Sequence, residues 1–244
     1  MNQTPSRTRG IKPVLPRLRF RRFSTVQLLI ALALLFTCAP FVEEIKGGDL
    51  VVSLLLSLVL LSGVFAVADR KRVLVVAIAL AIPAIAGRWI NHFRPDLVPP
   101  SFFLSAALVL TAFVVMNLLR FVLRASSVNV EVLCASISAY LMLGLMWTMA
   151  YWLVDQLTPG GAFSFNTNTG TRSMSGFTGF YFSFVTLSTV GYGDITPVSK
   201  VARMLAAMEA MTGLIYVAVL IARLVSLYSS PKSDPGIPKS EPPI

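Results

Sequence analysis

Residues 187–197 read LSTVGYGDITP, a short run with glycines at positions 191 and 193. The run lies between two apolar segments of a 244-residue chain in which 55% of the residues are hydrophobic and 13% are charged. An average soluble domain contains about 25% charged residues. The composition therefore excludes an ordinary soluble fold and indicates that the quoted run belongs to a membrane protein.

Six segments are apolar enough, and about long enough, to cross a bilayer, which requires about 20 predominantly apolar residues. We predict spans at about 24–42, 50–68, 73–90, 102–123, 130–153 and 198–227. Seven of the 21 Lys and Arg residues precede the first span, as is typical of a cytoplasmic segment. The net charge of +10 therefore indicates orientation in the membrane and contact with anionic lipids, and we expect no nucleic-acid partner.

The quoted run is too polar and too rich in glycine to be part of a span. Non-helical backbone at membrane depth is tolerated only where it is packed in protein or lines a water-filled path. Glycines allow positive φ, so successive carbonyls can turn to one side, and inward-facing carbonyls can replace the water shell of a cation. The preceding nine residues, GFYFSFVTL at 179–187, are too short to span and predict a re-entrant helix.

The run resembles the selectivity filter of potassium channels, TVGYG, which in that family lies between a short pore helix and a long inner helix. The matching residues are Thr189, Val190, Gly191, Tyr192 and Gly193, and the resemblance covers residues 130–228. It implies an all-α membrane protein with six transmembrane helices, a re-entrant pore helix between spans five and six, and a homotetrameric pore. It also implies that K⁺ binds the hydroxyl and carbonyl oxygens of Thr189 and the carbonyls of the next three residues, without any organic cofactor.

Several residues are expected to support the filter. Asp194 lies behind its outer mouth, and Ser188 begins the non-helical segment. Tyr181 and Phe182 stand where many family members carry two tryptophans. The Tyr181 hydroxyl can reach Asp194, whereas Phe182 has no donor for the filter tyrosine, so we expect an effect on filter stability and inactivation.

The sixth span resembles the inner helix of the family. Gly213 matches a hinge glycine, although close packing explains a glycine there equally well. Below it, four apolar residues recur every three or four positions and are expected to line the cavity and gate: Leu214, Val217, Ile221 and Val225.

Glu209 is the one acidic residue within this span. A charge at a helix centre costs about 2.5–3.5 kcal/mol or more, so the carboxyl must be partnered, protonated or close to water. We expect it behind the filter, with Ser183 or Thr186 as hydrogen-bond donors. A structural role and proton-sensitive gating both remain open.

The fourth span carries a single basic residue, Arg120, in place of an arginine ladder, so the first four spans resemble a voltage-sensor domain without gating charges. The predicted organisation is a disordered basic lead (1–23), a four-helix peripheral domain (24–125), a pore domain (126–229) and a disordered tail (230–244).

The sequence therefore predicts a potassium-selective channel that conducts passively, is not an enzyme and is not voltage-gated. We expect it in the plasma membrane, specifically a bacterial inner membrane, with both termini cytoplasmic. Two alternatives remain: a weakly selective cation channel on the same scaffold, or a proton-modulated potassium channel gated through Glu209.

Overall fold

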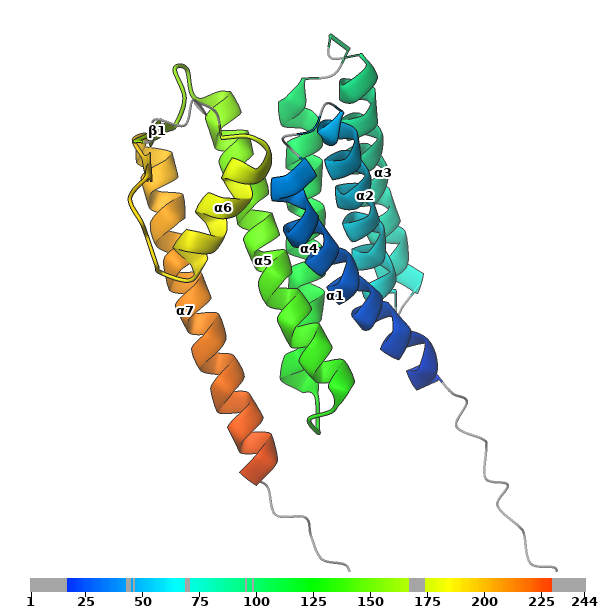
Figure 1. Ribbon diagram of the computed structural model, residues 1–244. Coiled ribbons are helices and arrows are strands. Elements are labelled where there is room, and N and C mark those ends of the chain that lie inside the picture. Colours follow the sequence, from blue (N-terminus) through cyan, green and yellow to red (C-terminus); the bar gives the residue numbers. More distant parts are fainter. Residues whose placement is uncertain are drawn as a thin grey trace, which may run out of the picture.

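The computed structural model describes residues 17–42, 45, 47–68, 71–94, 96–97, 99–166 and 174–229. Within them the chain forms seven helices and two short strands (Figure 1). The elements are α1 (Arg17–Val42), α2 (Gly48–Ala66), α3 (Lys71–Phe93), α4 (Pro100–Arg124), α5 (Val130–Leu157), β1 (Phe163–Phe165), α6 (Gly176–Leu187), β2 (Ile195–Pro197) and α7 (Lys200–Ser229).

Six of these helices are long and apolar enough to cross a membrane, which confirms the predicted number of spans within the described residues. The protein is therefore a multi-pass membrane protein. Local sequence explains where several helices begin. Pro100, at the first position of α4, needs no backbone hydrogen-bond donor there, and the side chain of Asn129 caps α5 by accepting a hydrogen bond from the Val132 amide at 2.9 Å.

The prediction of a disordered lead over residues 1–23 is wrong for its last part, because α1 begins at Arg17. No proline or glycine follows Pro16 for more than 20 residues, and arginine and leucine are good helix formers. The apolar pattern marked the span but not the helical turns that precede it. Residues 1–16 and the predicted tail 230–244 lie outside the described residues.

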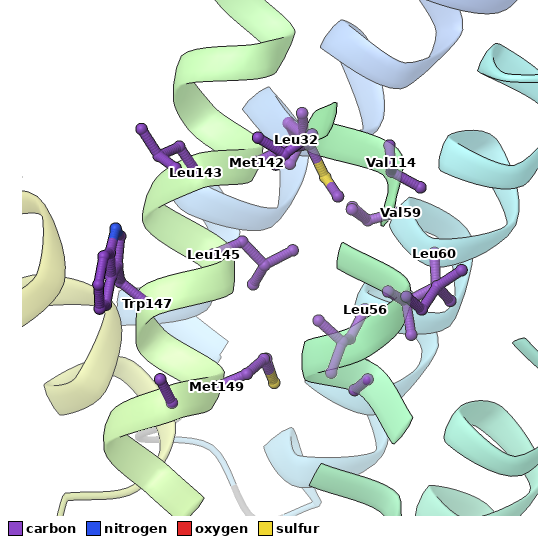
Figure 2. Packing of buried hydrophobic residues seen from close by; sticks show 14 of the residues in the cluster. Leu32, Leu56, Val59, Leu60, Val114, Met142, Leu143, Leu145, Trp147 and Met149 are labelled. Carbon is purple, nitrogen blue, oxygen red and sulfur yellow. The ribbon is translucent and has the colours of Figure 1, made fainter. Parts of the chain in front are cut away.

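The helix α5 stands between two groups of helices (Figure 1). It packs against α1 and α4 on one side and against α6 and α7 on the other. In Figure 2, Leu145 and Met149 point from α5 toward the side on which Leu56 and Val59 of α2 lie, whereas Trp147 lies on the opposite side of α5. One continuous apolar core therefore connects the first four helices to the part of the chain that holds the quoted run.

The helix α1 also belongs to both groups of helices. The ring of Phe36 makes edge-to-face contacts with Phe180 and Phe184 of α6, at centroid distances of 5.6 and 4.6 Å. The first span therefore packs directly on the short helix before the quoted run, a contact that the predicted division into a peripheral and a pore domain did not include.

The segment between α5 and α6 contains a short strand among its described residues. Residues 163–165 form β1, which pairs antiparallel with β2 so that Ser164 lies opposite Thr196. The side chain of Asp155 closes the turn by accepting the Ala162 amide at 2.7 Å. The segment is rich in Gly, Ser, Thr and Asn, which concealed the strand, because the pairing depends on contacts with residues 30 to 34 positions away.

Candidate functional site

The chain enters and leaves the site at the same end of the molecule. In Figure 1, α6 descends between α5 and α7, and the extended segment after it returns to the end where β2 and the start of α7 lie. The helix begins at residue 176, three residues before the predicted start, and ends at Leu187 as predicted.

The extended segment has an unusual backbone. Thr189, Gly191 and Gly193 have φ values of +60°, +57° and +80°, whereas the intervening Val190 and Tyr192 do not have positive φ. A backbone in which positive φ recurs at every second residue allows successive carbonyls to turn to one side. Thr189 is the one non-glycine residue with positive φ among the described residues, and such strain costs about 1–3 kcal/mol.

The first amides of this segment are tied to the end of α6. The Val190 and Gly191 amides donate to the carbonyl of Val185 at 2.9 and 3.3 Å, and the Thr189 amide donates to Thr186 at 2.9 Å. The Ser188 hydroxyl donates to the Phe184 carbonyl at 2.6 Å. These bonds satisfy the last carbonyls of the helix, which would otherwise lack partners.

The carbonyls of residues 189–193 have no hydrogen-bond donor among the described residues. Two side chains of this segment are also exposed: Val190 is 52% and Tyr192 is 71% exposed. The segment therefore presents a set of unpaired backbone oxygens at the surface of the single chain, beside the hydroxyl of Thr189.

The far end of the segment is held by a hydrogen bond that we predicted as feasible. The Tyr181 hydroxyl donates to Oδ2 of Asp194 at 2.7 Å, and the Ile195 amide donates to Oδ1 at 3.0 Å. Burial and the hydrogen bond to Asp194 raise the pKa of Tyr181 to about 12, so the phenol remains a donor at neutral pH. The carbonyl of Asp194 accepts the Asn166 amide at 2.7 Å, which links this end to β1.

Phe182 makes apolar contacts, unlike the adjacent Tyr181. Its side chain is buried, and its ring packs edge-on against Tyr151 and Phe163 at centroid distances of 4.9 and 5.2 Å. It therefore joins α6 to α5 and β1 through apolar contacts and, as expected, supplies no hydrogen-bond donor.

Glu209 is fully buried behind the extended segment, and both of its carboxyl oxygens accept hydrogen bonds. Ser183 donates to Oε1 at 2.5 Å, so of the two donors we expected, Ser183 is present and Thr186 is not. The second donor is the hydroxyl of Tyr151, which we did not predict. A tyrosine within a span needs a partner for its hydroxyl, so the sequence did contain a signal for this contact.

The Ser183 hydroxyl also lies 2.8 Å from the carbonyl oxygen of Gly144. A serine hydroxyl has one proton and can donate to one acceptor at a time, whereas a carbonyl oxygen can only accept. The carboxyl oxygen of Glu209 and the carbonyl oxygen of Gly144 therefore compete for the single proton of the Ser183 hydroxyl. The geometry is that of a compact cluster joining α5, α6 and α7.

The helix α7 contacts the rest of the chain along one narrow stripe. Its buried residues are Ala202, Glu209, Gly213 and Tyr216. A Cβ on Gly213 would collide with the carbonyl oxygen of Leu187 and would lie 2.9 Å from Cδ1 of that residue, so close packing on α6 accounts for the glycine. The four residues predicted to line a cavity are exposed in the single chain: Leu214, Val217, Ile221 and Val225.

Two further hydrogen bonds anchor the lower part of α7. The Tyr216 hydroxyl donates to the Ser136 carbonyl at 2.5 Å, and Nη2 of Arg223 donates to the Ala125 carbonyl at 2.6 Å. Sequence reasoning did not identify either contact. Together with Glu209, they attach α7 to α5 and to the corner between α4 and α5.

Comparisons with known proteins point to the same part of the chain. The ion channel family model matches residues 130–230, the range from the first residue of α5 to just beyond α7. The Two-pore potassium channel 4 of Arabidopsis thaliana is 47% identical over 47 residues. This match spans 19% of the present chain and 16% of the relative's length. No solved structure matches the chain.

Proposed function

We propose that this protein is a potassium-selective channel that conducts K⁺ passively, with residues 189–193 as the selectivity filter. One observation carries the proposal: five consecutive carbonyls lack donors among the described residues, on a backbone whose φ alternates in sign. Backbone carbonyls arranged in rings can replace the hydration shell of K⁺. The ion channel model over residues 130–230 and the similarity to a plant potassium channel support the same function.

A single chain provides one filter strand, so the proposal requires several copies, and four is the number that builds a potassium filter. The exposed apolar side chains of α7 support this assembly, since only a narrow stripe of that helix is buried. A hollow of about 430 Å³ beside Phe177, Phe184 and Val190 is also open in the single chain. We propose that a second copy of the chain packs into this hollow. In the assembled pore, α6 would be re-entrant, and the exposed face of α7 below Gly213 would line the cavity.

Gating by voltage has little support in the first four helices. The charged residues of α4 are Arg120 and Arg124, both in its last two turns, so few charges are placed to move through the membrane field. The basic ends of these helices favour a cytoplasmic location for both termini. The first four helices would then act as a structural support that reaches the pore through Phe36.

Proton modulation through Glu209 is a second candidate function, and the buried cluster with Tyr151 and Ser183 is the observation that favours it. A change in the protonation of this carboxyl would alter the hydrogen bonds between α6 and α7 directly behind the filter. Weak cation selectivity is a third possibility that no contact of the described residues favours.

The proposal can be tested with the purified protein in liposomes loaded with KCl and diluted into NaCl. A K⁺-selective path creates an inside-negative potential, which a cationic dye reports. A matched preparation loaded with NaCl and diluted into KCl should give the opposite potential. Equal permeation of both ions would leave the dye signal unchanged and would contradict the proposed selectivity.

A further inference from the structure

A cavity of about 460 Å³ lies among the first four helices, well away from the filter. It is formed by the third turn of α1, the start of α3 and the ends of α2 and α4, and Figure 1 shows these parts at the same end of the molecule. Its volume is within the range of ligand sites in proteins, about 300–1,000 Å³. The proposed conduction pathway does not use this cavity.

The chemistry of the cavity walls favours an anion. Arg120 and Arg124 both line the cavity and are one helical turn apart on α4, a spacing at which like charges repel. No acidic residue is among the described lining residues, and neither arginine forms an ion pair within the described part of the chain. An anion between the two guanidinium groups would relieve this repulsion and accept charge-assisted hydrogen bonds.

Polar groups beside the arginines have unused hydrogen-bonding capacity. Thr25 lines the cavity and is 1% exposed, and its hydroxyl has no hydrogen-bond partner in the described residues. Asn117 donates one amide hydrogen to the Phe113 carbonyl at 2.7 Å and retains a second one. A buried hydroxyl without a partner destabilises a protein, so a ligand that supplies an acceptor would satisfy it.

The position of the cavity favours a phosphate that is part of a lipid. Thr25 is the second residue of the first candidate span and Arg124 is the last residue of the fourth. Both therefore lie at the level at which lipid headgroups meet the hydrocarbon. The remaining walls include apolar side chains such as Val67 and Val73. Basic pockets between helices at this level are suited to anionic headgroups.

We propose that this cavity binds the headgroup phosphate of an anionic phospholipid, held by Arg120 and Arg124 with Thr25 and Asn117 as neutral partners. The site would also be linked to α7. Ala125 lines the cavity, and its carbonyl accepts the hydrogen bond from Arg223. A bound headgroup therefore contacts the same corner of the chain that anchors the last turns of the proposed inner helix. This inference does not depend on which ion the protein conducts.

The test measures lipid binding to the full-length protein in neutral detergent. Native mass spectrometry counts bound dioctanoyl phosphatidylglycerol, with zwitterionic dioctanoyl phosphatidylcholine as the comparison lipid. The unsubstituted protein should bind phosphatidylglycerol more tightly. The double substitution Arg120→Gln and Arg124→Gln should weaken that binding at least about tenfold, since it removes the charged donors. Binding of phosphatidylcholine should remain unchanged.

The matched control is Lys71→Gln with Arg72→Gln, which removes two positive charges at the same end of the molecule but from residues that do not line the cavity. It should retain the preference for phosphatidylglycerol. An equal loss in both double variants would show attraction to the surface charge alone and would overturn the site. Inorganic phosphate that competes at the same concentration as the lipid would overturn the assignment to a lipid.

A second variant keeps the test decisive if the arginine variant does not assemble. Thr25→Val removes the hydroxyl at nearly constant volume and leaves both arginines in place. Without lipid it should be at least as stable as the parent, because the hydroxyl it removes has no partner. It should nevertheless bind phosphatidylglycerol several-fold more weakly. Unchanged phosphatidylglycerol binding in this variant would by itself refute the proposed site.

Discussion

Glu209 in α7 accepts a hydrogen bond from the hydroxyl of Tyr151 in α5. Because Ser183 in α6 donates to the other carboxyl oxygen, a single side chain joins the three helices that surround the extended segment. The lower part of α7 is attached by two hydrogen bonds to backbone carbonyls. The position of α7 relative to the proposed filter therefore depends strongly on this carboxyl.

Replacement of Glu209 should separate its hydrogen-bonding role from its charge. Glutamine replaces one carboxyl oxygen by an NH₂ donor, so the amide of Glu209→Gln can accept from Tyr151 and donate to the oxygen of Ser183, whose proton can go to the Gly144 carbonyl. We expect its conductance, pH response and thermal stability to match those of the parent. Glu209→Ala should lower the free energy of unfolding by about 1–3 kcal/mol, because the Tyr151 hydroxyl loses its partner. The cavity left by the shorter side chain should lower it further. Thermal unfolding of the full-length protein measures both.

The double substitution Glu209→Leu with Tyr151→Phe is the control for that result. It removes both partners, and Ser183 still has the Gly144 carbonyl as an acceptor, so much of the stability should return. A parent that differs from the Glu209→Gln variant at pH 7 but matches it at pH 5 would contradict the structural role. That outcome would establish the proton-modulated channel instead.

Tyr181→Phe should weaken the outer end of the filter without changing which ion passes. The substitution removes the one hydroxyl that donates to Oδ2 of Asp194, while the Ile195 amide still holds Oδ1. A hydrogen bond to a charged group contributes about 1.5–3 kcal/mol. We expect faster decay of the current under sustained recording and unchanged ion preference. Tyr140→Phe, in the first half of α5, is the control and should have no such effect.

Gly213→Ala tests whether this glycine is required by packing. An added Cβ would collide with the carbonyl oxygen of Leu187, so α7 must move away from α6. We expect a lower thermal stability and altered open probability. Gly63→Ala in α2 is the matched control, because its Cβ would meet Val114 at an ordinary 3.4 Å. In the control, the free energy of unfolding should be unchanged or higher by up to about 1 kcal/mol. If Gly213→Ala is tolerated equally well, close packing does not explain this glycine.

The conductance should depend only weakly on voltage. Moving one charge across the full membrane field provides about 2.3 kcal/mol per 100 mV. The only charged residues of α4 are Arg120 and Arg124, which lie near one end of the helix. Single-channel recordings from −100 to +100 mV in symmetrical KCl would measure the open probability. A steep curve equivalent to several gating charges, in the absence of blocking ions, would contradict this prediction.

The spans, the short helix before the filter and the contact between Tyr181 and Asp194 could be predicted because they depend on local features. Hydropathy and length mark a span, and the filter motif fixes the positions of its neighbours. The pairing of β1 with β2 could not be predicted, because residues 163–165 lie in a segment rich in Gly, Ser and Asn and gain their structure from residues 195–197.

The partner of a buried polar group was equally hard to predict. Glu209 clearly needed donors, and helical position suggested α6, which correctly identified Ser183. The hydroxyl of Tyr151 comes from a helix 58 residues earlier in the sequence, and no local pattern relates the two positions. The bond between Arg223 and Ala125 spans 98 residues and was missed for the same reason.

The most direct test of the central claim is the reversal potential of the channel in a planar bilayer with KCl on one side and an equal concentration of NaCl on the other. We expect a reversal potential more than about 59 mV from zero, which corresponds to more than a tenfold preference for K⁺. Gly191→Ala, which places a side chain at φ +57°, should abolish the current or move this potential toward zero. Gly160→Ala, at φ +81° in the turn after α5, has comparable backbone strain outside the filter and should retain the parent value. A reversal potential at zero for the unsubstituted channel would contradict potassium selectivity.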